Sequence, residues 1–413
     1  MNTPALHPAA RPQHLAILIA IAAMFSLALA MGIGRFAFTP LLPLMLRDGV
    51  LLSDSGAWLA ASNYLGYLIG ALCASRVRLP PARLLTLSLI CIVIVTAAMG
   101  ITSSVWAWAV LRFLAGLCSA WALIATSAWG LGWMANLARP RLTGLIYAGV
   151  GLGIVAAGIF CLWAAEKMPA SEMWIVLACL ASLVAILPLI VSFYCPLPPV
   201  ANSIAAPVNA AQVSASESAS TSASTSAPGV TGLIICYGMF GFGYILPATY
   251  LPAQARQLLD DPQIFGWAWP VFGIAAAAST LIVAGVLGQC NRLNVWATSH
   301  ALMAVGVILP CLWLSMTSIV LAALFVGGNF MVITMLGMQE ARARAAANPT
   351  AVLARMTASF ALGQLLGPVV VALMNTFAAD HASALRYALQ LATACLVASA
   401  IYLWRRAESA QRH

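Results

Sequence analysis

The chain has 413 residues, of which only 7% are charged, whereas a soluble globular protein carries about 25% charged residues. Hydrophobic residues make up 63% of the chain, the mean hydropathy is +0.97, and the net charge is +9. So few charges cannot cover the surface of a water-soluble protein, so the composition excludes soluble enzymes and soluble nucleic-acid-binding proteins.

Long apolar runs recur along the whole chain, and each is long enough to cross a bilayer as a helix of about 20 residues. They predict an all-α membrane protein with twelve transmembrane helices, expected at 17–43, 56–75, 83–102, 105–134, 142–163, 173–194, 231–251, 265–288, 294–314, 318–339, 353–376 and 384–404.

One connection between these runs differs from the others. Residues 195–230 are rich in Ser, Ala, Thr and Pro, and Glu217 is the only charged residue among them. Such a segment cannot bury a core, so we expect a disordered linker. It divides the chain into two six-helix halves, residues 1–194 and 231–413.

The basic residues predict the orientation of the chain, because cytoplasmic loops are enriched in Lys and Arg. With twelve spans, four basic residues fall on one side of the membrane: Arg47, Lys167, Arg256 and Arg386. The side that holds both termini and the linker carries thirteen: Arg11, Arg76, Arg78, Arg83, Arg139, Arg141, Arg292, Arg342, Arg344, Arg355, Arg405, Arg406 and Arg412. We therefore expect both termini in the cytoplasm.

The first span of each half has a related sequence, which indicates an internal repeat. Residues 32–43 read GIGRFAFTPLLP and residues 241–252 read GFGYILPATYLP, at an offset of 209. Two six-helix halves in parallel orientation are the organisation of the major facilitator superfamily. Ala28-Leu29-Ala30 also resembles a signal-peptidase site. We do not favour cleavage there, because it would cut through the first span of the repeat.

Two pairs of glycines recur in corresponding spans: Gly149 with Gly153, and Gly363 with Gly367, which Pro368 follows. A glycine at every fourth position puts two small residues on one helix face and lets a second backbone approach closely. Static tight packing explains either pair alone. Their symmetric recurrence favours a seam along which helices move during gating.

Four segments of the first half together resemble the YbfB/YjiJ-type transporters of the major facilitator superfamily. They are GIGRF at 32–36, WLAASNYLGYLIG at 58–70, RFLAG at 112–116 and YAGVGLG at 147–153. The resemblance implies a bacterial inner-membrane transporter with no enzymatic activity. It does not identify the substrate. The wider superfamily usually has an acid before the basic loop between spans 2 and 3, where this chain has Ser75.

Polar residues concentrate in spans 1, 2, 4, 5, 7, 8, 10 and 11, which line the central cavity in the resembled fold. From these spans we select nine candidate substrate-binding residues: Arg35, Asn63, Tyr67, Arg112, Tyr147, Tyr237, Tyr244, Asn329 and Gln364.

Arg35 and Arg112 lie inside apolar spans, at a similar expected depth in the membrane, and none of the ten acidic residues lies deep in any span. A buried charge in a membrane needs a partner or water. One hypothesis is that one or both arginines bind an anionic substrate, most simply a carboxylate. The alternative is that they bind backbone carbonyl groups at helix breaks near Pro40 and Pro43.

The sequence thus predicts a secondary transporter that moves a small solute, most simply an organic anion, by alternating access. Export of amphipathic or aromatic compounds and a non-transporting membrane sensor are the alternatives. We expect a monomer in the lipid bilayer, with no metal, cofactor or nucleic acid partner. Protons are the coupling ion that the resemblance suggests. An end residue such as Glu340 could serve this coupling, whereas His300 in span 9 is expected to be a packing residue.

Overall fold

The computed structural model describes residues 10–51, 53–196, 230–258, 267–344, 348–377 and 380–411. Among these residues, twelve helices are long and apolar enough to cross a membrane, and no residue is in a strand. The predicted fold class and number of spans are therefore confirmed. Most of the predicted linker, residues 197–229, lies outside the described residues.

The first half contains six spans, of which the first is interrupted. It comprises α1 (Ala10–Leu27), the π-helical segment η1 (Ala28–Phe36) and α2 (Phe38–Arg47). The remaining spans are α3 (Ser53–Ala74), α4 (Pro81–Ile101), α5 (Val105–Asn136), α6 (Thr143–Ala164), which follows the short η2 (Pro140–Leu142), and α7 (Ala170–Tyr194).

The second half contains the other six spans, and its first helix is continuous. These helices are α8 (Val230–Leu258), α10 (Ala268–Val286), α11 (Arg292–Leu312), α12 (Met316–Arg344), α13 (Pro349–Phe377) and α14 (His381–Gln411).

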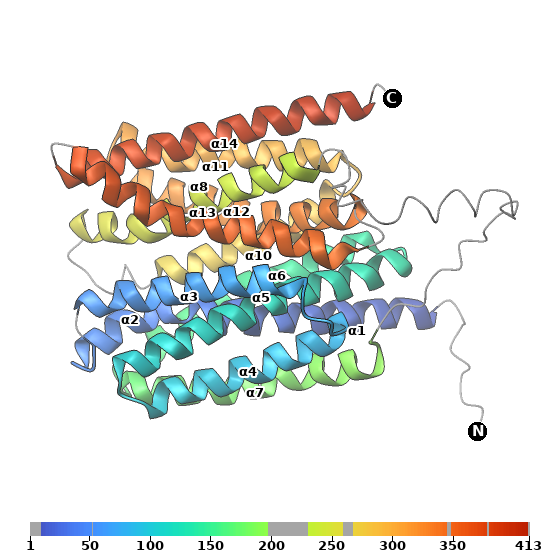
Figure 1. Cartoon of the computed structure of the whole chain (residues 1–413), viewed down its shortest axis with the longest axis horizontal. Helices are drawn as coiled ribbons and strands as arrows, with labels where there is room; N and C mark the ends of the chain where they lie inside the picture. The colour runs from blue at the N-terminus through green and yellow to red at the C-terminus, as the bar shows by residue number, and fades with distance from the viewer. Residues whose placement is uncertain are drawn as a thin grey trace, which may run out of the picture.

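The two halves lie side by side with their helices roughly parallel (Figure 1). The start of α1 and the end of α14 lie at the same end of the bundle, which we call the terminal end. The opposite end, where α2 finishes at Arg47, is called the far end. Apolar side chains such as Ile94 and Leu183 are exposed along the outer helices, as expected where a helix faces lipid rather than water.

The predicted glycine pairs pack helices closely within each half. In the first half, Gly149 of α6 lies against the carbonyl group of Met24 in α1. One turn later, Gly153 lies against the backbone of Ala28 and Gly32 in η1. A side chain at either glycine would collide with backbone atoms, so only glycine permits this approach.

The second pair makes the corresponding contact in the second half. Gly363 of α13 lies against the backbone of Gly238 and Phe242 in α8, and Gly367 lies against Ile245. Pro368 follows inside α13. The recurrence found in the sequence thus reflects the same packing of span 5 on span 1 and of span 11 on span 7.

Other glycines lie at the contact between the halves. The expectation that the two predicted pairs move during gating stays a prediction. Along the junction of α6 with α10, each small residue of one helix meets the backbone or a small side chain of the other: Gly144 with Thr280 and Ala284, Gly151 with Gly273 and Ala277, and Gly158 with Pro270. A sequence pattern identifies small residues on a helix but not which neighbour they face.

Candidate functional site

The first span changes its helical winding where it carries Arg35. The π-helical segment η1 ends at Phe36, and α2 begins two residues later. Pro40 has no N–H group to donate to the Phe36 carbonyl group, so regular α-helical bonding is interrupted here. π-helical turns are uncommon and often occur at functional sites. The sequence motif located this position but did not predict its π-helical form.

Arg112 of α5 forms hydrogen bonds with the backbone of η1. Its Nη1 donates to the carbonyl oxygen of Gly34 at 3.3 Å, and its Nη2 donates to that of Arg35 at 3.2 Å. The guanidinium also lies 4.5 Å from the ring centre of Phe38. This arrangement matches the backbone-carbonyl alternative for Arg112, with the carbonyl groups supplied by η1, which ends shortly before Pro40.

Arg35 points from η1 toward the second half. Its side chain is 3% exposed, and Nη2 donates a hydrogen bond to Oε1 of Gln364 in α13. The guanidinium lies over the ring of Tyr67 in α3, 3.8 Å from its centre. Three of the predicted site residues, from three different spans, are therefore in contact at the junction of the halves.

This cluster contains several polar atoms that have no hydrogen-bond partner within the described part of the chain. They are Nε and Nη1 of Arg35, the hydroxyl group of Tyr67, Nε2 of Gln364 and Oδ1 of Asn63. Asn63 lies one turn before Tyr67 and uses its other amide atom, Nδ2, to donate to the carbonyl group of Arg112 at 2.9 Å. Buried polar groups are nearly always hydrogen-bonded, so unpaired ones clustered around a charge make this cluster the candidate binding site.

The other predicted residues take part in separate contacts. Tyr147 of α6 exchanges a 2.8 Å hydrogen bond with Ser127 of α5. Asn329 of α12 donates to the carbonyl group of Phe325 in its own helix.

The two tyrosines of the second half belong to an aromatic cluster. Tyr237 packs against Trp296 and Phe360, and Tyr244 stacks on Phe330 with ring centres 4.3 Å apart.

Aromatic side chains also join the two halves next to Arg35. Phe36 makes edge-to-face contacts with Trp269 at 6.0 Å and with Phe330 at 6.1 Å. Trp269 stacks on Phe272 within α10. Phe36 and Phe330 are not among the predicted site residues, because an aromatic residue in an apolar span cannot be told from a packing residue by its sequence position. The position of Phe36 beside Arg35 was the available signal.

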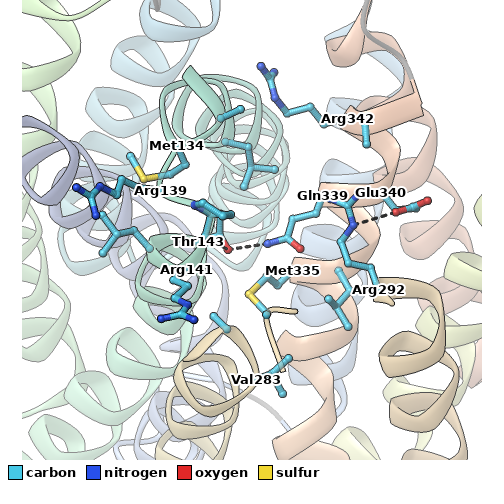
Figure 2. Close-up of a pocket in the computed structure, with 18 of the residues that line it drawn as sticks. Met134, Arg139, Arg141, Thr143, Val283, Arg292, Met335, Gln339, Glu340 and Arg342 are labelled. Atoms are coloured by element: carbon cyan, nitrogen blue, oxygen red, sulfur yellow. Dashed lines mark hydrogen bonds and ion pairs between the residues drawn. The ribbon is translucent and has the colours of Figure 1, made fainter. Parts of the chain in front are cut away.

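A large cavity of about 1180 Å³ opens between the halves at the terminal end, and we call it the vestibule (Figure 2). Its lining includes residues of α5, α6 and the connection between them, and residues of α10, α11 and α12. A 2.6 Å hydrogen bond from Gln339 to Thr143 crosses between the halves. Arg342 also crosses, donating to the carbonyl group of Ala128 at 3.3 Å.

The two titratable residues considered for proton coupling both have polar partners in the structure. Glu340 binds Arg344 at 2.7 Å and Arg292 at 3.3 Å on the wall of the vestibule. His300 is buried in the second half between the carbonyl groups of Trp296 and Cys236.

A sequence model of the family described as uncharacterised MFS-type transporter YbfB matches residues 27–403, which is most of the chain. The chain belongs to this family. No curated protein matches it at a significant level. Among solved structures, the human organic anion transporter MFSD10 (TETRAN) is similar over 96% of this chain and 100% of its own, with a TM-score of 0.64 and 13% sequence identity.

The YbfB-type family and the shared fold establish the general activity. The protein is a multi-pass membrane protein of the major facilitator superfamily that transports a solute, and it is not an enzyme. At 13% identity, the similarity to MFSD10 supports the fold alone. The resemblance stated from the sequence motifs is therefore confirmed, and the substrate has to be argued from the site.

Proposed function

We propose that this transporter carries a small organic anion by alternating access and that Arg35 binds the anionic group, most simply a carboxylate. The observation that carries the proposal is the position of Arg35: a buried cation at the junction of the halves, bound to the neutral amide of Gln364. A neutral amide cannot balance the charge of a buried guanidinium. A bound carboxylate would balance it.

Four of the five unpaired atoms named for this cluster can donate hydrogen bonds, and Oδ1 of Asn63 is the one acceptor, so the set favours an anion over a neutral or cationic solute. Nε and Nη1 of Arg35 and Nε2 of Gln364 can only donate hydrogen bonds, and the hydroxyl group of Tyr67 can also donate. A ligand that satisfies them must supply acceptor atoms, as a carboxylate does. The printed name of MFSD10, which shares the fold, describes an organic anion transporter and agrees with this choice.

The aromatic contacts beside Arg35 support an aromatic or amphipathic substrate, which was the second possibility raised by the sequence. Phe36, Trp269 and Phe330 present ring surfaces from both halves next to the guanidinium. An aromatic carboxylate would use both features of the site. Export of an uncharged aromatic compound would use only the rings.

The same contacts suggest how binding is coupled to movement. The Arg35–Gln364 hydrogen bond joins η1 of the first half to α13 of the second. An incoming carboxylate would replace Gln364 as the partner of Arg35 and release this connection between the halves. In alternating access, the halves then rock around the bound substrate.

The remaining expectations concern the cellular setting. We propose that the terminal end faces the cytoplasm of a bacterial inner membrane, because most of the arginines gather there. A monomeric state stays a prediction. Proton coupling also stays a prediction, and transport by proteoliposomes that does not respond to an imposed pH gradient would contradict it.

The experiment is a thermal-shift comparison of carboxylates with their uncharged amides on the purified full-length protein, for example benzoate against benzamide. A ligand at ten times its Kd adds about 1.4 kcal/mol to the stability of the folded state. We expect benzoate to stabilise the protein more than benzamide does. The Arg35→Gln variant should lose this difference, and Arg35→Lys should keep part of it.

Arg78→Gln provides the matched control, because Arg78 is exposed in the α3–α4 connection. It should behave as the wild type. If carboxylates and their amides stabilise the protein equally across a panel of such pairs, the proposal of an anionic substrate is rejected, and export of uncharged aromatic compounds is favoured. Counterflow of the stabilising compound across proteoliposomes then tests whether it is transported.

A further inference from the structure

The vestibule has an unusual concentration of positive charge for a chain with so few charged residues. Of the residues that the structure describes, five arginines line it, and Glu340 is the single acidic residue in the lining. They come from both halves of the molecule: Arg139 and Arg141 from the α5–α6 connection, and Arg292, Arg342 and Arg344 from α11 and α12.

Glu340 neutralises only part of this charge. Its carboxylate binds Arg292 and Arg344, both in the second half. Arg139 and Arg141 are exposed, and no salt bridge is found for either among the described residues. Arg342 donates to a backbone carbonyl group rather than to an acid. In the described ranges of the chain, three arginines therefore face the vestibule without an acidic partner, and they lie on opposite walls (Figure 2).

Cations on opposite walls of one cavity repel each other and attract anions from solution. Walls of low dielectric constant strengthen the attraction, because they focus the electric field into the cavity. Positive-inside topology explains why arginines lie at this end of the bundle. It does not explain why five of them line the space between the halves.

We infer that the vestibule is a second anion-binding site, in which Arg139, Arg141 and Arg342 capture a soluble carboxylate- or phosphate-bearing anion from the terminal side. Its role as the entry to Arg35 rests on the proposed function, but binding in the vestibule does not. An anion held there would neutralise the facing charges and allow the two walls to approach.

A soluble anion fits this cavity better than the headgroup of a lipid. A lipid must pass its acyl chains out between helices, and the junction of α6 with α10 is closed by backbone contact at the terminal end. Gly144 lies against the carbonyl group of Thr280 and the side chain of Ala284 there. The lining also carries neutral hydrogen-bonding groups, among them Gln289 and Gln339.

The test uses citrate as the probe, in equilibrium dialysis with the purified full-length protein in an uncharged detergent. We expect Arg139→Gln/Arg141→Gln to weaken citrate binding about tenfold at low salt and to remove most of its salt dependence. Arg76→Gln/Arg78→Gln is the matched control, because it removes two exposed arginines from the same half and the same end. It should change the affinity less than twofold.

Three results would overturn the inference. The first is an unchanged affinity in the vestibule variant, and the second is an equal loss in the control variant. The third is displacement of citrate by phosphatidylglycerol from the wild type but not from the vestibule variant, which would assign the site to lipid.

The Arg35→Gln variant separates this site from the proposed substrate site. It should bind citrate in the vestibule as the wild type does while losing the preference for benzoate over benzamide. If that preference is absent from the wild type, the proposed function fails while the vestibule result stands. If substitution of the vestibule arginines leaves citrate affinity unchanged, the inference of a second anion-binding site is rejected, and the benzoate result remains valid.

Discussion

The first spans of the two halves share the spacing of their glycines but differ at the residue after the second glycine. Gly34 is followed by Arg35, and its counterpart Gly243 is followed by Tyr244. In the first half, the span unwinds into η1 and carries a buried cation with unpaired donors. In the second half, α8 continues without a break, and Tyr244 stacks on Phe330. The two halves thus share the packing of these spans, whereas, among the side chains that the structure describes in them, the buried cation lies in the first half alone.

The largest expected effect concerns Arg112. Its guanidinium donates to backbone carbonyl groups of η1, a segment of the first half. Arg112→Leu leaves the carbonyl groups of Gly34 and Arg35 without these donors, so it should destabilise the protein by about 2–4 kcal/mol. Thermal unfolding without ligand measures this, with Arg78→Leu as the exposed control. A melting temperature equal to that of the control would mean that η1 does not depend on Arg112.

The second prediction compares Arg35 directly with Tyr244. Arg35→Gln should weaken the binding of an aromatic carboxylate 10- to 100-fold, since a hydrogen bond to a charged group contributes about 1.5–3 kcal/mol. Tyr244→Phe should change it by about threefold or less, because its ring contact is kept. Titration with benzoate measures both. Equal losses in the two variants would show that the halves share the recognition of charge.

The third prediction concerns a feature that the two halves share, the close packing of neighbouring spans at a glycine. Gly153→Val and Gly363→Val should each destabilise the protein by about 1–3 kcal/mol, because a side chain at either position meets backbone atoms of the neighbouring span. Gly285→Val is the control, since no atom of the described residues lies within 4 Å of a Cβ atom placed there. Thermal unfolding should rank both variants below the control, and a large loss in only one half would weaken the argument from the repeat.

The smallest effect is a pH dependence at the far end of the first half. Burial tends to raise the pKa of Asp48, but the N–H group of Ala170 and the guanidinium of Arg47 outweigh it and lower that pKa. The carboxylate therefore stabilises the fold above the unfolded-state pKa of about 3.9, and this contribution is lost as the pH falls through the lower folded-state value. Asp48→Asn should cost about 0.3–1 kcal/mol at pH 7, because Asp48 accepts from the first residue of α7.

The measurement is the difference in melting temperature between wild type and Asp48→Asn at pH 7 and near pH 3. The difference should shrink at the lower pH. A constant difference would show that charge is not the cause.

Part of the site was predictable from residue types and their spacing. Arg35, Tyr67 and Gln364 were selected because they are polar residues in spans that line the cavity in the resembled fold, and they are in contact. The roles of the two arginines could not be separated in the same way. Their partners are the carbonyl groups of η1 for Arg112 and an amide of the other half for Arg35, and neither is near in sequence.

The vestibule could not be predicted from the sequence either. Arg139, Arg141 and Arg342 are visible in the sequence as basic residues at helix ends, where they indicate orientation. Whether a helix end faces lipid, solvent or the other half depends on the lateral arrangement of twelve helices, which loop composition does not encode.

The sequence by itself determined the class of protein, the twelve spans, the repeat and the family. Apolar length and periodic small residues are local properties, and the bilayer leaves few alternatives to a bundle of helices. Only the tertiary structure decided which backbone each glycine approaches, which arginine donates to backbone carbonyl groups of its own half and which donates to a side chain of the other half. Those outcomes depend on contacts between spans far apart in the chain, such as η1 with α13, and on the winding of η1.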